Sequence, residues 1–280
     1  MQTKPESSLM ISTLQRKWAM ALFFLLHCML LSSCMTVPIT GRSQLNILSS
    51  SGMIALSNET YGNFKKSNQE STDRKNTATV KSVGTRLQLA VERYLRQKGM
   101  AAEVDGYAWE FKLFESKDVN AFALPGGKVV IYTGILPYTK TDAGLAVVMS
   151  HEIAHVIARH GNERMSQALI SQMGGIALNE ALSSQSQKTK DLWAGIYGIG
   201  TTFGFLMPYS RMQETEADHI GLIFMAMAGY DPNEAVPFWR RMAAQPGNRP
   251  LEFLSTHPVP ESRIRQIQSE IPEAMRYYRK

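Results

Sequence analysis

The chain has 280 residues and a formal net charge of +6, from 30 basic and 24 acidic side chains. With 44% hydrophobic residues and only two cysteines, its composition excludes a disordered tail, a collagen-like repeat and a disulfide scaffold. A basic surplus is compatible with nucleic acid or an anionic membrane surface. No stripe of basic and aromatic residues runs along the chain, so no nucleic-acid partner is predicted.

The N-terminus has the layout of an export signal. Residues 18–31 carry no formal charge and directly follow Arg16 and Lys17, as the hydrophobic core of a secretory signal follows its positive segment. A transmembrane helix needs about 20 apolar residues. The uncharged run is shorter than that, so a membrane-spanning anchor is disfavoured.

The end of this segment predicts a lipid anchor. Residues 31–34 read LSSC and resemble a bacterial lipobox, which predicts removal of a signal peptide over residues 1–33 and acylation of Cys34. Cleavage would remove three basic residues and one acidic residue, leaving a charge of +4. The expected location is the bacterial cell envelope, anchored in the bilayer and facing the periplasm. Met35, where an Asp would favour the inner membrane, favours the outer one.

Hydrophobic periodicity predicts the elements of the remaining chain, which we divide into a tether and one domain. The predictions, in chain order, are a tether over 34–43, a single domain over 44–280, helices over 44–70 and 80–97, a strand over 109–115, a hairpin whose strands 119–124 and 128–133 flank Pro125-Gly126-Gly127, and mainly helix from 142 onward. A small sheet beside several helices indicates an α+β domain. The uncharged run 193–207 is too short to span a membrane and is expected to form a buried helix or a flap near the site.

Residues 151–155 read HEIAH and lie in an almost wholly apolar stretch over 143–158. Positions i and i+4 share one face of a helix, so His151 and His155 can bind one metal ion. Glu152 lies beside that face, where it can take a proton from metal-bound water. Because buried His and Glu side chains need polar partners, a Zn²⁺ ion is predicted here.

A catalytic zinc site keeps three protein ligands and one open position. A metzincin site is excluded because it needs Gly at position 158 and His at position 161, where this chain has Ala158 and Gly161. The predicted third ligand is Glu214, with Glu180 as the competing candidate. Asp218 follows Glu214 by four residues, so it can face the same site and accept the outer ring N–H of a ligand histidine.

The roles of the neighbouring polar residues are less constrained by spacing. His257, in a proline-rich loop, is expected either to donate to the oxyanion, to cap the metal as a fourth, inhibitory ligand, or simply to pack in its loop. Arg211 and His219 are the other candidate oxyanion donors. Glu216 is expected on a solvated helix face. His160 lies about 140° around the helix from the second ligand and is predicted to be structural, with Arg159 solvated.

Several spaced motifs together resemble the zinc endopeptidases of peptidase family M48, in particular its soluble branch. The motifs that carry this resemblance are VPITGR (37–42), HEIAHVIARH (151–160), SRMQETEAD (210–218), STHP (255–258) and RI (263–264). The resemblance implies a zincin-like (gluzincin) fold, one Zn²⁺ per chain, Glu214 as the third ligand and protein or peptide substrates.

These observations predict a membrane-anchored zinc metalloendopeptidase that hydrolyses envelope proteins, including misfolded ones, with Glu152 activating zinc-bound water. The alternative is a zinc-containing, chaperone-like or binding protein of the envelope with little proteolysis. A deformylase-type hydrolase is disfavoured, because that chemistry usually pairs HExxH with an upstream cysteine. The hairpin before the HExxH helix offers a strand edge that can bind an extended substrate. The sequence makes no prediction of oligomeric state.

Overall fold

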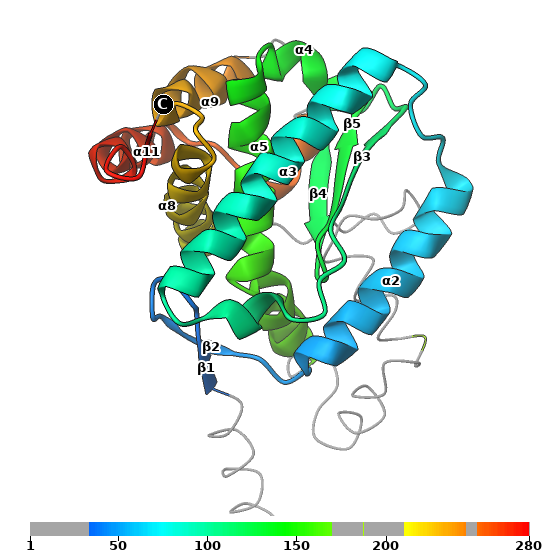
Figure 1. The fold of residues 1–280 in the computed structure, drawn as a ribbon, viewed down its shortest axis with the longest axis vertical. Coiled ribbons are helices and arrows are strands. Elements are labelled where there is room, and N and C mark those ends of the chain that lie inside the picture. The colour runs from blue at the N-terminus through cyan, green and yellow to red at the C-terminus, as the bar shows by residue number, and fades with distance from the viewer. Residues whose placement is uncertain (1–33, 170–186, 188–209, 245–250, 280) are drawn as a thin grey trace, which may run out of the picture.

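A computed structural model of the chain describes residues 34–169, 187, 210–244 and 251–279 (Figure 1). The α-helices are α2 (Ser50–Ser67), α3 (Arg74–Gln97), α4 (Leu136–Thr139), α5 (Asp142–Ile157), α8 (Arg211–Met227), α9 (Ala235–Ala243), α10 (Glu252–Thr256) and α11 (Glu261–Ala274). The strands are β1 (Cys34–Thr36), β2 (Ser43–Leu45), β3 (Glu110–Phe114), β4 (Ala121–Leu124) and β5 (Lys128–Tyr132). Residues 160–169 are also helical. The predicted fold, mainly helical with a small sheet beside the HExxH helix, is confirmed.

The main sheet has three strands in the order β3-β5-β4. β4 and β5 form the predicted antiparallel hairpin, whose turn contains Gly126 and Gly127 at φ +86° and +84°. Glycine is favoured at such positions because positive φ is unfavourable for residues with a Cβ. β3 pairs with β5 in parallel, so among the described elements β4 is an edge strand.

The sheet lies between two layers of helices. Side chains on one face of its strands, such as Leu113, Ala123 and Ile131, join the large core formed with α3, α5, α8, α9 and α11. Side chains on the other face, such as Phe122 and Val130, pack in a second cluster that includes α2. The alternation of faces along a strand explains this division. Figure 1 shows α3 crossing the sheet and α2 standing at its other side.

The helix predicted over residues 80–97 begins earlier, at Arg74, because Asp73 caps it by accepting a hydrogen bond from the N–H of Asn76 at 3.0 Å. The helix predicted over 44–70 is shorter and spans α2, where Ser49 is the cap. The uncharged run 193–207 lies outside the described residues.

The segment predicted as a tether, residues 34–43, contains β1 and the first residue of β2, and these two strands pair in antiparallel fashion. Between these strands the chain turns, with hydrogen bonds from Val37 N to the Arg42 carbonyl at 2.8 Å and from Gly41 N to the Val37 carbonyl at 3.0 Å. The Val37 side chain is buried in the large core. This turn therefore packs against the domain.

Candidate metal centre and active site

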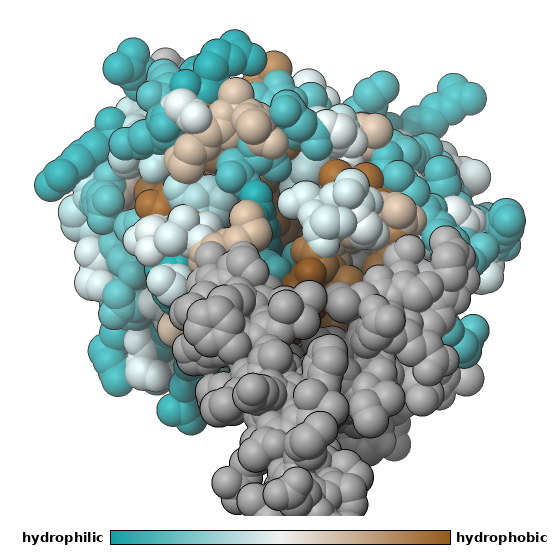
Figure 2. Space-filling model, turned by 90° about the horizontal axis from the view of Figure 1, so that it is seen from below, coloured by the Kyte–Doolittle hydropathy of each residue, from teal (hydrophilic) through white to brown (hydrophobic). Residues whose placement is uncertain are grey.

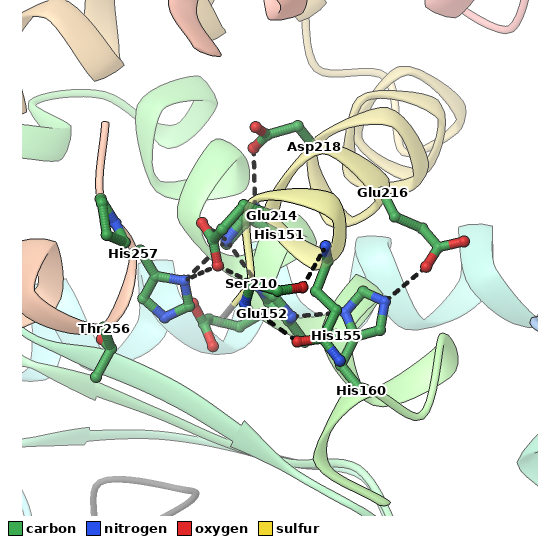
Figure 3. Close-up of polar contacts among 12 residues, drawn as sticks. His151, Glu152, His155, His160, Ser210, Glu214, Glu216, Asp218, Thr256 and His257 are labelled. Atoms are coloured by element: carbon green, nitrogen blue, oxygen red, sulfur yellow. Dashed lines mark hydrogen bonds and ion pairs between the residues drawn. The ribbon is translucent and has the colours of Figure 1, made fainter. Parts of the chain in front are cut away.

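Helix α5 presents the two histidines of the HExxH sequence inside the protein. Thr141 caps the helix by accepting from Gly144 N at 3.0 Å, and almost every residue after the first turn is buried. His151 and His155 lie one turn apart, as predicted, and their Nε2 atoms are 3.0 Å apart. Figure 3 shows both rings directed toward the same point.

Helix α8 brings Glu214 to the same point. Ser210 caps α8 and forms a capping box with Gln213, which places Glu214 in the first turn. One carboxylate oxygen of Glu214 lies 3.3 Å from His155 Nε2, and the other lies 3.6 Å from His151 Nε2. The competing residue Glu180 lies outside the described residues.

A glycine permits this close contact between α8 and α5. A Cβ added at Gly221 would lie 3.1 Å from the backbone nitrogen of His151 and 3.2 Å from its Cα. Contacts this short with rigid backbone atoms would push the two helices apart. The small residue therefore sets the distance between the helix that carries the histidines and the helix that carries Glu214.

His257 is the fourth group at this point. It is the C-cap residue of α10, and its Nδ1 lies 2.9 Å from Glu214 Oε1 and 3.2 Å from His151 Nε2. One ligand atom from each of His151, His155, Glu214 and His257 lies within 4.8 Å of all the others. All four residues are buried, and their ligand atoms are close enough together to hold one metal ion.

The chemistry of the four groups fits a small divalent cation. Imidazole nitrogens and a carboxylate oxygen are ligands that zinc accepts in a tetrahedral arrangement. Glu214 and Glu152 also bring two carboxylates into the interior, and the side chain of each is only 3% exposed. A positive ion among these groups would compensate the negative charge that they bring into the interior.

The two glutamates of the site have opposite electrostatic environments. Burial raises the pKa of Glu152 above its ordinary value, because the positive groups near it offset only part of the desolvation. Burial alone would also raise the pKa of Glu214, but His257 and Arg263 hold it well below its ordinary range. Glu214 therefore stays anionic, as a metal ligand must, whereas Glu152 can accept a proton.

Asp218 lies behind His151, as its spacing from Glu214 predicted. His151 Nδ1 is 3.0 Å from Asp218 Oδ1, on the side of the ring away from the convergence point. Arg263 in turn holds Asp218 through two hydrogen bonds, Nε to Oδ2 at 2.6 Å and Nη2 to Oδ1 at 2.9 Å. The same guanidinium also pairs with Glu214 and donates to the Pro258 carbonyl at 3.0 Å.

Arg263 is a site residue for which the sequence predicted no role. Its only signal was its place in the shared RI motif, which gave no role. In the structure its guanidinium stacks over Trp239, 4.4 Å from the ring centre, and is buried. Its contacts therefore connect three parts of the site: Glu214, the carboxylate of Asp218 behind His151, and the loop that carries His257.

The prediction that Glu216 is solvated is wrong. Glu216 is 7% exposed and lies 2.9 Å from His160 Nε2. Its side of α8 faces residues 160–169 and the turn over 37–42 instead of solvent, because these segments cover the helix from outside the metal site. His160 is fully buried and does not reach the convergence point, which agrees with the structural role predicted for it.

Three other residues with predicted roles lie outside the four groups of the metal site. His219 is 3.8 Å from Glu270 and partly exposed, and it is not among the four groups of the metal site. Arg159, predicted as solvated, pairs with Glu103 and is only 17% exposed in its side chain. Arg211 is exposed at the start of α8 and lines the cavity beside the metal site.

That cavity has a volume of about 900 Å³ and includes Glu214 and Arg263 in its wall. The other lining residues are Arg211, Thr215, Leu254, Pro258, Val259, Pro260, Ser262 and Gln266. Its wall is thus part apolar and part polar, as in many ligand clefts. Figure 2 shows the molecule from below, with a hollow where hydrophobic atoms lie between hydrophilic ones. Within the described ranges, no helix is both long and apolar enough to cross a bilayer.

The sequence of this chain is similar to those of known proteins. The model of peptidase family M48 matches residues 82–271. The mitochondrial metalloendopeptidase OMA1 of Schizosaccharomyces pombe is 40% identical over 191 residues, which are 66% of this chain and 53% of the relative. The OMA1 of Saccharomyces cerevisiae is 33% identical over 253 residues, 86% of this chain and 70% of the relative. The beta-barrel assembly-enhancing protease of Escherichia coli is 32% identical over 162 residues, 56% of this chain and 33% of the relative.

The chain thus spans about half the length of the first of these relatives and a third of the last. The family match covers more than half of this chain and contains the residues of the metal site. The chain belongs to peptidase family M48.

Proposed function

We propose that this protein is a zinc metalloendopeptidase. The observation that carries the proposal is the convergence of His151, His155 and Glu214 in a buried metal site with Glu152 beside it. The names of the OMA1 relatives, which describe metalloendopeptidases, support the same activity.

The residues suggest how a peptide bond would be hydrolysed. A bound zinc ion would supply a Lewis acid that polarises the scissile carbonyl and lowers the pKa of water. Glu152 would remove the proton of the attacking water and deliver it to the leaving amine. Its raised pKa suits this exchange, because a base that is buried and only partly compensated can hold the proton between the two steps. Asp218 and Arg263 would keep His151 and Glu214 in place.

His257 would control access to the site. Its Nε2 lies 3.4 Å from Glu152 Oε1, and its Nδ1 lies among the other ligand atoms. A site with four protein ligands is closed, whereas hydrolysis needs one position for water. We propose that His257 closes the site as the fourth ligand and leaves it when substrate binds, which is one of the three alternatives that the sequence left open.

The edge of β4 would hold the substrate, in particular at Ala123, because the N–H of Ala121 already donates to Asn120 Oδ1 at 2.9 Å. Tyr132 N donates to the Asn120 carbonyl at 3.2 Å, so residues 120 and 122 face β5 with their backbone groups, and Ala121 and Ala123 face the opposite way. The side chains of β4 are buried on both faces of the sheet, so the backbone edge is the part that can pair with an extended peptide. The cavity beside Glu214 would accept side chains of that peptide.

We place the enzyme at the bacterial cell envelope. The support is in the sequence: a signal-like segment over 1–33, a lipobox-like ending at Cys34 and an expected charge of +4 after cleavage. Acylation of Cys34 would anchor the domain to a bilayer facing the periplasm, by preference the outer membrane, where its substrates would be envelope proteins, including misfolded ones. Globomycin-sensitive processing tests the anchor, and an unmodified Cys34 would contradict it.

The activity is tested with three proteins: wild type, Glu152→Gln and Glu214→Ala. Zinc content and cleavage of unfolded casein are measured together. We expect Glu152→Gln to keep zinc and lose cleavage by at least the ~100-fold that general-base catalysis contributes. Glu214→Ala should lose most of both. Cleavage that Glu152→Gln leaves undiminished would end the proposal, and a wild type that binds zinc and suppresses aggregation without cleaving would favour the chaperone-like alternative.

A further inference from the structure

The turn over residues 37–42 reaches the metal site through a chain of polar contacts, which are partly buried at the turn and fully buried beside the site. Arg42 is the last residue of this turn. Its Nη1 and Nη2 each donate to a carboxylate oxygen of Glu163 at 2.8 Å, and its Nε donates to Glu216 Oε2 at 2.9 Å. Thr40 donates from its hydroxyl to the other oxygen of Glu216. Gln213 adds a hydrogen bond to Glu163 at 2.7 Å.

The chain continues from Glu216 to a metal ligand. Glu216 Oε2 lies 2.9 Å from His160 Nε2, and His160 Nδ1 lies 2.8 Å from His155 Nδ1. His160 is fully buried and His155 is 2% exposed, so water does not compete for these contacts. Figure 3 shows His160 between His155 and Glu216.

Only one assignment of protons to the neutral rings satisfies both of these contacts when His155 binds a metal through Nε2. His155 Nδ1 then carries the proton and donates to His160 Nδ1. His160 must accept at Nδ1 and carry its own proton on Nε2, from which it donates to the carboxylate of Glu216. The carboxylate receives its remaining hydrogen bonds from Thr40 and Arg42. Each group thus fixes the orientation and tautomer of the next.

We propose that His160, Glu216 and Arg42 are positioning residues for the metal ligand His155, so that the turn after Cys34 is a working part of the metal centre. The two ligand histidines of α5 are then held in matching ways. His151 is held by Asp218, which Arg263 fixes. His155 is held by the carboxylate of Glu216 acting through His160, and Arg42 fixes that carboxylate.

The inference rests on the proposed metal function, and its test uses zinc affinity instead of cleavage. The dissociation constant for Zn²⁺ is measured by competition with a chromophoric chelator for wild type, Glu216→Gln and Arg42→Met. Removing the partner behind a ligand histidine lowers metal affinity by roughly 10- to 100-fold, and we expect a loss of this size in both variants. Cobalt-loaded protein should also show a changed visible spectrum, because that spectrum reports the geometry of the ligands.

Arg241→Met is the matched control. The side chain of Arg241 is 23% exposed and that of Arg42 is 19% exposed. Arg241 pairs with Glu234 at 2.7 Å, and neither residue is among the four groups of the metal site. We expect Arg241→Met to bind zinc like wild type. Zinc affinities of Glu216→Gln and Arg42→Met within twofold of this control would overturn the inference, whereas a wild type that binds no zinc would overturn the proposed function itself.

Two milder variants decide the question if Glu216→Gln and Arg42→Met do not fold. Thr40→Val removes one hydrogen bond to Glu216 from an exposed residue. Arg42→Lys keeps the charge but lacks the planar fork that holds Glu163 and Glu216 together. We expect each to weaken zinc binding by about 2- to 10-fold, which is less than the loss expected for Glu216→Gln and Arg42→Met. Wild-type affinity in both would equally refute the positioning role.

Discussion

Replacing Arg263 should show how much its buried ion pairs contribute to the stability of the site. Its guanidinium makes ion pairs with both Asp218 and Glu214, and these three side chains are at most 5% exposed. The substitution Arg263→Met keeps an unbranched side chain that can still pack against Trp239. It removes the charge, so two buried carboxylates lose their common cation.

The expected cost follows from this burial. Removing one partner of a buried ion pair destabilises a protein by about 3–5 kcal/mol, mainly because the remaining charge is left without compensation. For domains of this size 1 kcal/mol corresponds to a change in Tm of about 2–4 °C. We therefore expect Tm of metal-free Arg263→Met to lie roughly 6–20 °C below that of the metal-free wild type.

Zinc should reduce this difference. A bound cation would compensate Glu214, leaving Asp218 as the carboxylate that still lacks a partner. The assay is thermal unfolding with zinc and with a chelator, and the gap between wild type and variant should be smaller with zinc.

The same arginine control serves here. Arg241 pairs with Glu234, with side chains 23% and 25% exposed, and also donates to the Tyr138 carbonyl at 3.1 Å. A pair nearer the surface contributes less than a buried one, only about 0–1 kcal/mol where it is exposed. If metal-free Arg263→Met unfolded at the same temperature as Arg241→Met, the buried pairs of Arg263 would not stabilise the site and the reasoning would be refuted.

Three further predictions test other parts of the site and fold. His257→Ala should weaken zinc binding by at least the ~10-fold that loss of a supporting group costs and should cleave casein at least as fast as wild type at saturating zinc; lost cleavage would instead indicate an oxyanion donor. Ala123→Pro should raise KM by roughly fivefold by removing one edge N–H, worth about 1 kcal/mol, with normal thermal unfolding; an unchanged KM would exclude β4 as the substrate edge. Burial would raise the pKa of Glu110, but its hydrogen bond to Lys128 at 2.9 Å and the charge of Lys128 lower it overall. This pair therefore stabilises the fold above the unfolded pKa of about 4.3 and loses that effect as the pH falls. Between pH 5 and 3, the free energy of unfolding measured in urea should fall more for wild type than for Glu110→Gln. An equal fall in both proteins would contradict this.

The sequence allowed the helix of the histidines and its partner to be predicted because both depend on local spacing. The i, i+4 relation brings His151 and His155 together on any helix. The same relation brings Asp218 to the face of Glu214. The hairpin was equally accessible, since two glycines between apolar runs are a strong turn signal.

What could not be predicted depends on contacts between segments far apart in the chain. Arg42 and Glu216 are separated by 174 positions, and Arg263 and Asp218 by 45. No periodicity links residues at such distances, so a charged residue in the sequence indicates a solvated face unless a partner is known. The error at Glu216 and the missing role of Arg263 have this common cause.

The positions of the acidic residues around helix α8 explain why Glu216 was wrongly predicted to face solvent. Glu214 and Asp218 lie about 40° apart around the helix, and Glu216 lies about 200° from Glu214. On an amphipathic helix that opposite side would face water. Here most residues of α8 are buried on all sides, so every acidic group on it needs its own partner.

Those partners come from opposite ends of the described chain. Arg42 precedes every helix that the structure describes and compensates Glu216, whereas Arg263 lies in the first turn of α11 and compensates Asp218 and Glu214. Helix α8 carries Glu214, the proposed third metal ligand, and both arginines must be in place before all three acidic residues of α8 are compensated. The metal centre is therefore completed only when the N-terminal turn and the start of α11 have both packed onto α8, which ties its assembly to the folding of the whole domain.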